Sequence, residues 1–141
     1  MNKPLSELFT INRRFARSIN LERDFDLEDA LQGYILTDRS TAVLKHILID
    51  AINSDSTSAI TITSVYGTGK SAFANFLGSL CAAEDNPVRK MAFDIAQKSL
   101  DASQFEALRA NNPAQGFLRA IATAQSEPLS HGFVDTKLHN S

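Results

Sequence analysis

The stretch Ser64-Val65-Tyr66-Gly67-Thr68-Gly69-Lys70-Ser71 decides most of what this sequence predicts about its fold. It follows a run rich in β-branched residues, 59–63, and it leads into a segment with a helical spacing of apolar residues, 71–77. A strand, a glycine-rich turn, Gly-Lys-Ser and a helix, in this order, form the phosphate-binding loop called a P-loop. The sequence therefore predicts a site for the phosphates of a nucleotide.

Each residue type in this loop has a chemical task. Gly67 and Gly69 permit backbone angles that a side chain disfavours, so that consecutive amide groups can point into one concavity. The helix that follows adds the positive end of its dipole. Lys70 is expected to contact the β- and γ-phosphates of ATP, and the hydroxyl of Ser71 is expected to complete the shell of Mg²⁺. The predicted cofactor-binding residues are Ser64, Gly67, Thr68, Gly69, Lys70, Ser71 and Ala72.

One position departs from the full P-loop pattern. The pattern has glycine where this chain has Ser64. A serine reduces the backbone freedom at the end of the strand, but its presence removes no phosphate ligand. The alternative interpretation is a chance Gly-Thr-Gly-Lys-Ser in an ordinary turn. The strand before the loop and the helix after it favour the functional interpretation.

Composition limits the other possibilities. The chain has 141 residues, 43% of them hydrophobic, and a formal charge of −2, which is typical of one globular unit. No apolar run approaches the ~18 residues of a membrane span, and the N-terminus is too polar for a secretory signal, so we expect a cytoplasmic protein. The single cysteine, Cys81, excludes an internal disulfide and is expected to be buried and inert. No zinc site is predicted from the three scattered histidines, His46, His131 and His139.

Residues 1–37 are interpreted as an N-terminal leader, and residues 38–141 as a partial P-loop domain. The leader contains a basic cluster of four arginines, followed by an acidic run: Arg13, Arg14, Arg17 and Arg23, then Asp24, Asp26, Glu28 and Asp29. Arginine clusters are typical of contacts with nucleic acid or with acidic partners. Because the acidic run follows directly, a local salt-bridged segment is the favoured interpretation, with nucleic acid as the alternative.

The remaining elements follow from periodicity and from turn signals. An amphipathic helix is predicted at 38–53, capped by Asp38, Ser40 or Thr41, then a polar turn and the buried strand 59–64. Further helices are predicted at 70–83, at 88–100 and around Phe105 and Leu108. A strand at 116–123, a helix start at 126–128 and a frayed end at 131–141 complete the chain. The predicted fold class is α/β: an incomplete three-layer α/β/α core of the P-loop NTPase kind, preceded by a helical N-terminal segment.

Tyr34–Thr37, followed by the amphipathic helix, the polar linker and Ala59–Ser71, resembles the entrance to an additional-strand P-loop ATPase of the AAA+ or STAND type. More narrowly, the stretches Arg17–Asp24, Gly33–Thr37 and Tyr66–Ala74 are similar to the start of large bacterial ATP-binding proteins, some of them encoded near phage-defence or DNA-processing genes. The segments 116–118 and 126–129 also look like the next strand and helix of such proteins. The resemblance implies that Tyr34 and Ile35 lie near the nucleotide base.

ATPases of this kind also carry an acidic motif, in which an aspartate holds Mg²⁺ through water and a glutamate activates the attacking water. No acidic residue after Ser71 convincingly follows an apolar strand; the ones considered are Asp94, Asp101, Glu106 and Asp135. The resemblance further implies that a P-loop strand is central and takes its neighbours from later in the chain. We therefore interpret these residues as the N-terminal part of a larger ATPase, which binds ATP and Mg²⁺ but hydrolyses little or nothing alone.

Two other functions stay open. A small phosphotransferase needs arginines that reach the phosphates, and the candidates are Arg89, Arg109 and Arg119. A non-enzymatic interaction protein would bind a partner through the basic cluster or the helix at 38–53 and would keep a vestigial P-loop. The expected partners are the nucleotide and other protein subunits or the remainder of a larger chain, and no membrane. The choice between ATP and GTP and the oligomeric state do not follow from the sequence.

Overall fold

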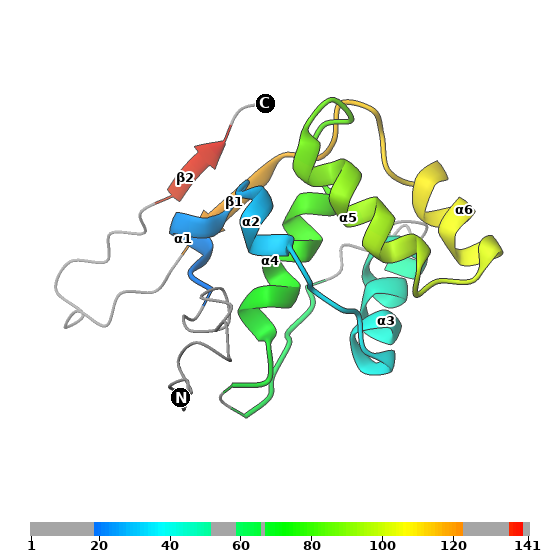
Figure 1. The fold of residues 1–141 in the computed structure, drawn as a ribbon, viewed down its shortest axis with the longest axis horizontal. Helices are drawn as coiled ribbons and strands as arrows, with labels where there is room; N and C mark the ends of the chain where they lie inside the picture. The colour runs from blue at the N-terminus through cyan, green and yellow to red at the C-terminus, as the bar shows by residue number, and fades with distance from the viewer. Residues whose placement is uncertain (1–18, 52–58, 66, 123–135, 140–141) are drawn as a thin grey trace, which may run out of the picture.

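The computed structural model of the chain describes residues 19–51, 59–65, 67–122 and 136–139. This part is α-rich, with one two-stranded antiparallel sheet (Figure 1). Its helices are α1 (Leu21–Asp24), α2 (Glu28–Leu31), α3 (Asp38–Lys45), the π-helical η3 (His46–Ala51), α4 (Lys70–Leu80), α5 (Pro87–Gln97) and α6 (Ala102–Ala110). Its strands are β1 (Arg119–Ala122) and β2 (Thr136–His139).

The amphipathic helix predicted at 38–53 is confirmed as α3 and η3, as far as Ala51. Its N-cap is Thr37 rather than the predicted Asp38, Ser40 or Thr41. Thr37 Oγ1 accepts a hydrogen bond from Ser40 N at 3.3 Å, and Ser40 Oγ accepts one from Thr37 N at 2.8 Å. Each side chain therefore satisfies an amide that the first turn of a helix leaves without a partner.

The helices after the glycine-rich loop also form where apolar spacing predicts them. Asn86 caps α5 by accepting from Val88 N at 3.0 Å, and Pro87 occupies the first helical position. Asp101 caps α6 by accepting from Gln104 N at 2.9 Å. Helix α4 ends at Leu80, before the predicted Ala83, and the carbonyl groups of Cys81 and Ala82 that follow accept from Phe117 N and Arg89 Nη1.

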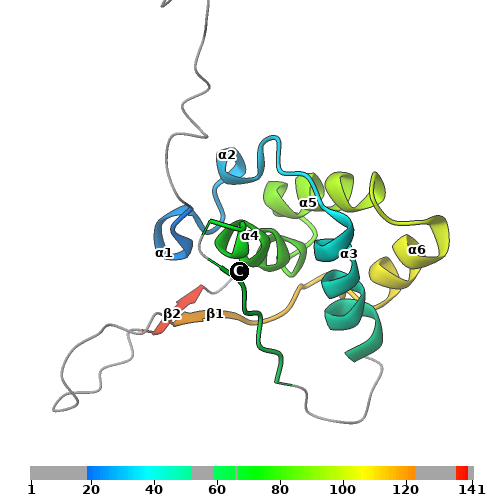
Figure 2. The same ribbon diagram turned by 90° about the horizontal axis from the view of Figure 1, so that it is seen from below.

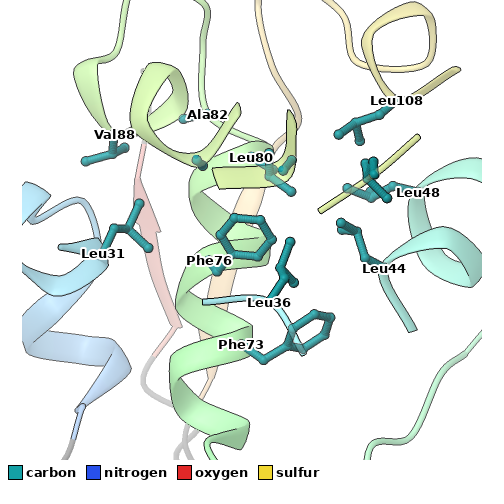
Figure 3. Packing of buried hydrophobic residues seen from close by; sticks show 13 residues of the cluster. Leu31, Leu36, Leu44, Leu48, Phe73, Phe76, Leu80, Ala82, Val88 and Leu108 are labelled. Carbon is teal, nitrogen blue, oxygen red and sulfur yellow. The ribbon is translucent and has the colours of Figure 1, made fainter. Parts of the chain in front are cut away.

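Helix α4 lies at the centre of the packing and contacts α1, α2 and α5 (Figures 1 and 2). Phe73, Phe76 and Leu80 are its buried apolar residues, and they recur at the spacing of one helical face. Figure 3 shows Phe76 among buried leucines from α2, α3 and η3. The buried cluster consists of Leu31, Leu36, Leu44, Leu48, Phe73, Phe76, Leu80, Ala82, Val88, Ala92, Ala96, Leu100 and Leu108.

The leader contributes to this core from residue 19 onward. Leu31 of α2 and Leu36 after it are 1% and 7% exposed and belong to the same cluster as Phe76. Arg23 Nε lies 2.7 Å from Asp24 Oδ1, which confirms a salt-bridged segment at this point. The other three arginines of the basic cluster lie outside the described residues.

The predicted strand at 59–64 is wrong as a strand. The chain runs extended into the glycine-rich loop, but no described segment pairs with it, and Ile60 and Ile62 are 38% and 41% exposed. An extended segment becomes a β-strand only when a neighbour accepts and donates its backbone hydrogen bonds. The described residues therefore do not form the parallel sheet of a three-layer core.

The strand predicted at 116–123 is confirmed as β1, which pairs with β2 in antiparallel register, Arg119 opposite His139 and Ala122 opposite Thr136. This pairing corrects the prediction that residues 131–141 fray, because 136–139 gain backbone partners on β1. The helix start predicted at 126–128 lies outside the described residues.

Candidate phosphate-binding loop

Both glycines of the loop adopt the left-handed backbone region. Gly67 has φ of 83° and Gly69 has φ of 84°. A Cβ atom added at either position would find no heavy atom within 4 Å, so the backbone angle rather than crowding favours glycine. The prediction that Gly67 and Gly69 adopt backbone angles that a side chain disfavours is confirmed. Tyr66, which precedes Gly67, lies outside the described residues.

The loop leads directly into the N-terminus of α4. Gly69 is the N-cap of this helix and, having no side chain, makes no capping hydrogen bond. Its carbonyl accepts from Phe73 N at 2.9 Å, so the helical ladder begins here. The amide groups of the first turn, including those of Lys70, Ser71 and Ala72, have no acceptor within the helix. Donors of this kind, at the positive end of the helix dipole, favour an anion.

Lys70 turns its side chain back onto the loop. Its Nζ donates to Ser64 O at 2.9 Å and to Val65 O at 3.0 Å. The ammonium is thereby held over the segment that precedes the glycines. No acidic residue occurs from Ser64 to Ala83, so Lys70 carries the one formal charge in this part of the chain.

Two hydroxyl groups connect the two sides of the loop. Thr68 Oγ1 donates to Val65 O at 2.9 Å, and it also forms a short hydrogen bond with Ser64 Oγ. The sequence pattern did not reveal this pair, although the departure from glycine at Ser64 marked one of its members. Ser71, by contrast, is exposed and its hydroxyl makes no hydrogen bond within the described part of the chain.

The opposite end of α4 is closed by polar side chains that periodicity could not reveal. Arg89 Nη1 donates to Ala82 O and to Pro113 O, each at 2.7 Å, and Asn112 Nδ2 donates to Leu80 O at 2.7 Å. Phe117 N donates to the carbonyl of Cys81 at 2.9 Å. Carbonyl groups that a helix C-terminus leaves open are therefore satisfied from α5 and from the segment before β1.

Arg119 joins β1 to the leader and to α4. Its Nη1 lies 2.6 Å from Asp26 Oδ1 and 3.4 Å from Gly78 O, and its guanidinium carbon lies 4.9 Å from the centre of the Phe25 ring. A Cβ at Gly78 would meet this ring at 2.4 Å, so α4 and the leader approach each other at a glycine. Asp26 itself has φ of 67°, a conformation that aspartate tolerates better than most residues.

The three arginines considered as phosphate contacts are not gathered at the loop. Arg89 and Arg119 are buried toward the C-terminal end of α4, where carbonyls and Asp26 occupy their guanidinium groups. The 11 residues of α4 span about 16 Å at ~1.5 Å per residue. Arg109 is exposed on α6, 3.7 Å from Glu106.

The residues that the resemblance places near a base have other surroundings. The Tyr34 ring centre lies 5.1 Å from that of Phe76, and burial raises the pKa of the Tyr34 phenol. Tyr34 therefore packs against the hydrophobic core. Ile35 is 77% exposed and is one of the large apolar side chains open to solvent.

Three of the acidic residues considered for hydrolysis lie on a helix or at the start of one. Asp94 is exposed on α5, Asp101 is the N-cap of α6 and Glu106 is exposed on α6; Asp135 lies outside the described residues. Within the described ranges, no three His, Cys, Asp or Glu side chains are grouped so as to hold a metal ion.

Cys81, the C-cap of α4, is partly buried. Burial raises the pKa of its thiol to about 11, against a smaller opposing effect of Arg119 and Arg89. A thiol with this pKa is protonated at neutral pH and is a poor nucleophile, as predicted for an inert cysteine.

Comparison of the chain with known protein families, with curated proteins and with solved structures finds no match. Among the described residues, no helix is both long and apolar enough to cross a membrane. Function is therefore inferred from the geometry of the loop and from its sequence.

Proposed function

We propose that residues 64–72 bind the phosphates of a nucleoside triphosphate, with ATP as the ligand and Mg²⁺ as its counterion. The observation that carries this proposal is the combination of Gly67 and Gly69 in the left-handed region with Lys70 Nζ folded back onto the loop that leads into an uncapped helix start. Backbone donors, a helix dipole and one ammonium are the groups that favour a polyphosphate. The phosphate contacts would come from the amides of Gly67 to Ala72 and from Lys70.

The chemistry of the donor set fits Mg²⁺ bound through the nucleotide. Ser71 offers one hydroxyl oxygen in the first turn of α4, beside the proposed phosphate position. Mg²⁺ keeps several water ligands and binds phosphate oxygens readily, so one protein oxygen is sufficient. When bound, the ion would neutralise phosphate charge. The chain's own residues would orient the triphosphate by backbone donors and by the Lys70 ammonium.

The same proposal includes the finer fold. We infer that the extended segment 59–65 is the P-loop strand of a three-layer α/β/α core and needs neighbouring strands to complete it. The exposure of Ile60 and Ile62 supports this inference, because a strand of such a core has its apolar side chains covered by neighbouring elements. Hydrolysis would then need acidic residues outside the described part of the chain, so the proposed activity is binding, within a larger ATPase.

Calorimetric titration tests the binding site. The full chain is titrated with a non-hydrolysable ATP analogue in the presence of Mg²⁺, beside Lys70→Ala and beside Lys98→Ala as a matched control. Lys98 is an exposed lysine at the C-cap of α5. We expect wild type and Lys98→Ala to bind equally and Lys70→Ala to lose measurable binding. Unchanged affinity in Lys70→Ala would contradict the proposal.

A non-enzymatic interaction protein is the second candidate, favoured by the exposure of Ile60, Ile62 and Val65 on the extended segment. Large apolar side chains that are open to solvent are typical of a surface awaiting a partner. Partner binding that ignores nucleotide and survives Lys70→Ala would favour this second function over the first.

A further inference from the structure

The two hydroxyl groups of the loop form a directed chain of hydrogen bonds. A hydroxyl has one hydrogen to donate. Because Thr68 Oγ1 donates to Val65 O at 2.9 Å, the hydrogen between Ser64 Oγ and Thr68 Oγ1 comes from Ser64. The order is therefore Ser64 hydroxyl to Thr68 hydroxyl to Val65 carbonyl.

The Lys70 ammonium ends on the same carbonyl. Val65 O accepts from both Thr68 Oγ1 and Lys70 Nζ, which uses its two lone pairs, and Lys70 Nζ also donates to Ser64 O. Side-chain hydrogen bonds thus connect residues on both sides of Gly67. We call the Ser64 and Thr68 hydroxyls, with their bond to Val65 O, the hydroxyl clasp.

A loop with two glycines in left-handed conformations loses much conformational freedom when it orders around a ligand. An interaction that fixes the loop beforehand lowers that cost and so raises affinity. Neither the Ser64 hydroxyl nor the Thr68 hydroxyl needs to touch the phosphates for this effect. Both side chains are exposed, so their hydrogen bonds hold the loop and contribute little to the core.

We propose that the hydroxyl clasp makes Ser64 and Thr68 positioning residues, which hold the loop in its phosphate-binding shape before the nucleotide arrives. This inference rests on the proposed function. It assigns a role to the one position where the loop departs from the glycine of the P-loop pattern. Ser64 then raises the affinity of the loop for phosphate, whereas the pattern alone predicts a higher affinity with glycine at this position.

Four variants test whether the serine or a glycine at position 64 gives the higher affinity. Each variant is titrated by calorimetry with Mg²⁺ and a non-hydrolysable ATP analogue and, separately, with inorganic pyrophosphate. Ser64→Ala removes one hydrogen bond of the clasp, and we expect affinity to fall about three- to tenfold. Ser64→Gly restores the pattern but loses the hydroxyl, so we expect a similar or larger loss. Thr68→Val removes both bonds and should cost about tenfold or more, while Thr68→Ser keeps the hydroxyl and should bind like wild type.

Thermal unfolding of the same variants is the control for a merely structural effect, and we expect all four to unfold within a few degrees of wild type. Equal losses for pyrophosphate and for the ATP analogue place the effect at the phosphates. Tighter binding by Ser64→Gly, or unchanged binding by Ser64→Ala and Thr68→Val, overturns the clasp and leaves the proposed function standing. A folded wild-type chain that binds neither ligand overturns both.

Discussion

The two ends of helix α4 are built in opposite ways. At the N-terminal end, Gly69 provides no side-chain cap, the surrounding side chains are exposed, and Lys70 reaches only the carbonyls of its own loop. At the C-terminal end, buried Arg89 and Asn112 satisfy the carbonyls, and Gly116 packs against the backbone. The N-terminal end of α4 is therefore open to solvent, and the C-terminal end is closed by the fold. The comparison predicts that mutations at the closed end affect stability and that mutations at the open end affect binding.

The largest difference is expected between two glycines with similar backbone angles. Gly116 has φ of 74°, and a Cβ there would meet the Ala82 carbonyl carbon at 2.6 Å. Gly69 has φ of 84° and open space around it. Gly116→Ala should lower the free energy of unfolding by about 3 kcal/mol or more, from steric overlap added to the backbone penalty. Gly69→Ala should cost only about 1 kcal/mol.

Urea denaturation of both glycine variants beside wild type measures this difference. A Gly116→Ala protein as stable as Gly69→Ala would show that the two ends of α4 are not packed differently.

Removal of the buried guanidinium at the closed end should have the next largest effect. Arg89 donates to the carbonyls of Ala82, Pro113 and Asn112, and it lies over the Phe93 ring at 5.3 Å. Arg89→Met leaves the carbonyls of Ala82 and Asn112 without these donors, while Pro113 O keeps the Gly116 amide at 3.0 Å. The substitution should destabilise by about 3 kcal/mol.

Arg109→Met is the matched control for Arg89→Met, because Arg109 is exposed and its contact with Glu106 is long, at 3.7 Å. The control should change stability by no more than about 0.5 kcal/mol. Equal shifts of Tm in the two variants would contradict the account of the closed end.

The chemistry of Cys81 provides a third test of the closed end. Its thiol pKa is raised from 9.0 to about 11, so at pH 8 the folded protein holds roughly a hundredfold less thiolate than the unfolded chain. Alkylation by iodoacetamide at pH 8 should be slower by about this factor in buffer than in concentrated urea. Because the folded state keeps its proton longer, the thiol also makes stability fall as pH rises above about 9. Equal alkylation rates in buffer and in urea would show that the thiol is not buried as described.

The smallest effect is expected at a buried amide with no hydrogen bond. Neither polar side-chain atom of Asn75 has a partner among the described residues, although the residue is 1% exposed. Asn75→Leu removes this unsatisfied group and should be neutral or stabilising by up to about 1 kcal/mol. Asn112→Leu is the contrast, since it deletes the donor to Leu80 O and should destabilise by about 2 kcal/mol. Calorimetric unfolding measures both variants. An Asn75→Leu protein that is less stable than Asn112→Leu would contradict this assignment.

The sequence predicted the open end better than the closed end, for a physical reason. The loop and the helices are local features: Gly67, Gly69 and Lys70 lie within four residues, and helical periods repeat within one turn. The closed end depends on partners far apart in sequence, such as Arg119 and Asp26, which are 93 residues apart. No local pattern reveals which distant carbonyl a buried arginine will meet.

The prediction of a strand at 59–64 was wrong for the same reason, since a strand also depends on a partner elsewhere in the chain. A β-branched run favours extended backbone, and residues 59–65 are extended, but a strand also needs a neighbour that the run itself does not specify. The strand at β1 was predicted correctly because its partner β2 is present, although the sequence did not reveal β2. The hydroxyl clasp was missed because serine and threonine in a glycine-rich turn carry no periodic signal.

The most direct test of the difference between the ends is thermal unfolding of wild type and Lys70→Ala, each with and without Mg²⁺ and a non-hydrolysable ATP analogue. A ligand that binds only the folded state at a hundred times its Kd stabilises by about 2.7 kcal/mol. We expect nearly equal Tm values without ligand, and a rise of several degrees with ligand in wild type alone. The same rise in Lys70→Ala, or no rise in wild type, would contradict the assignment of the open end of α4 to phosphate binding.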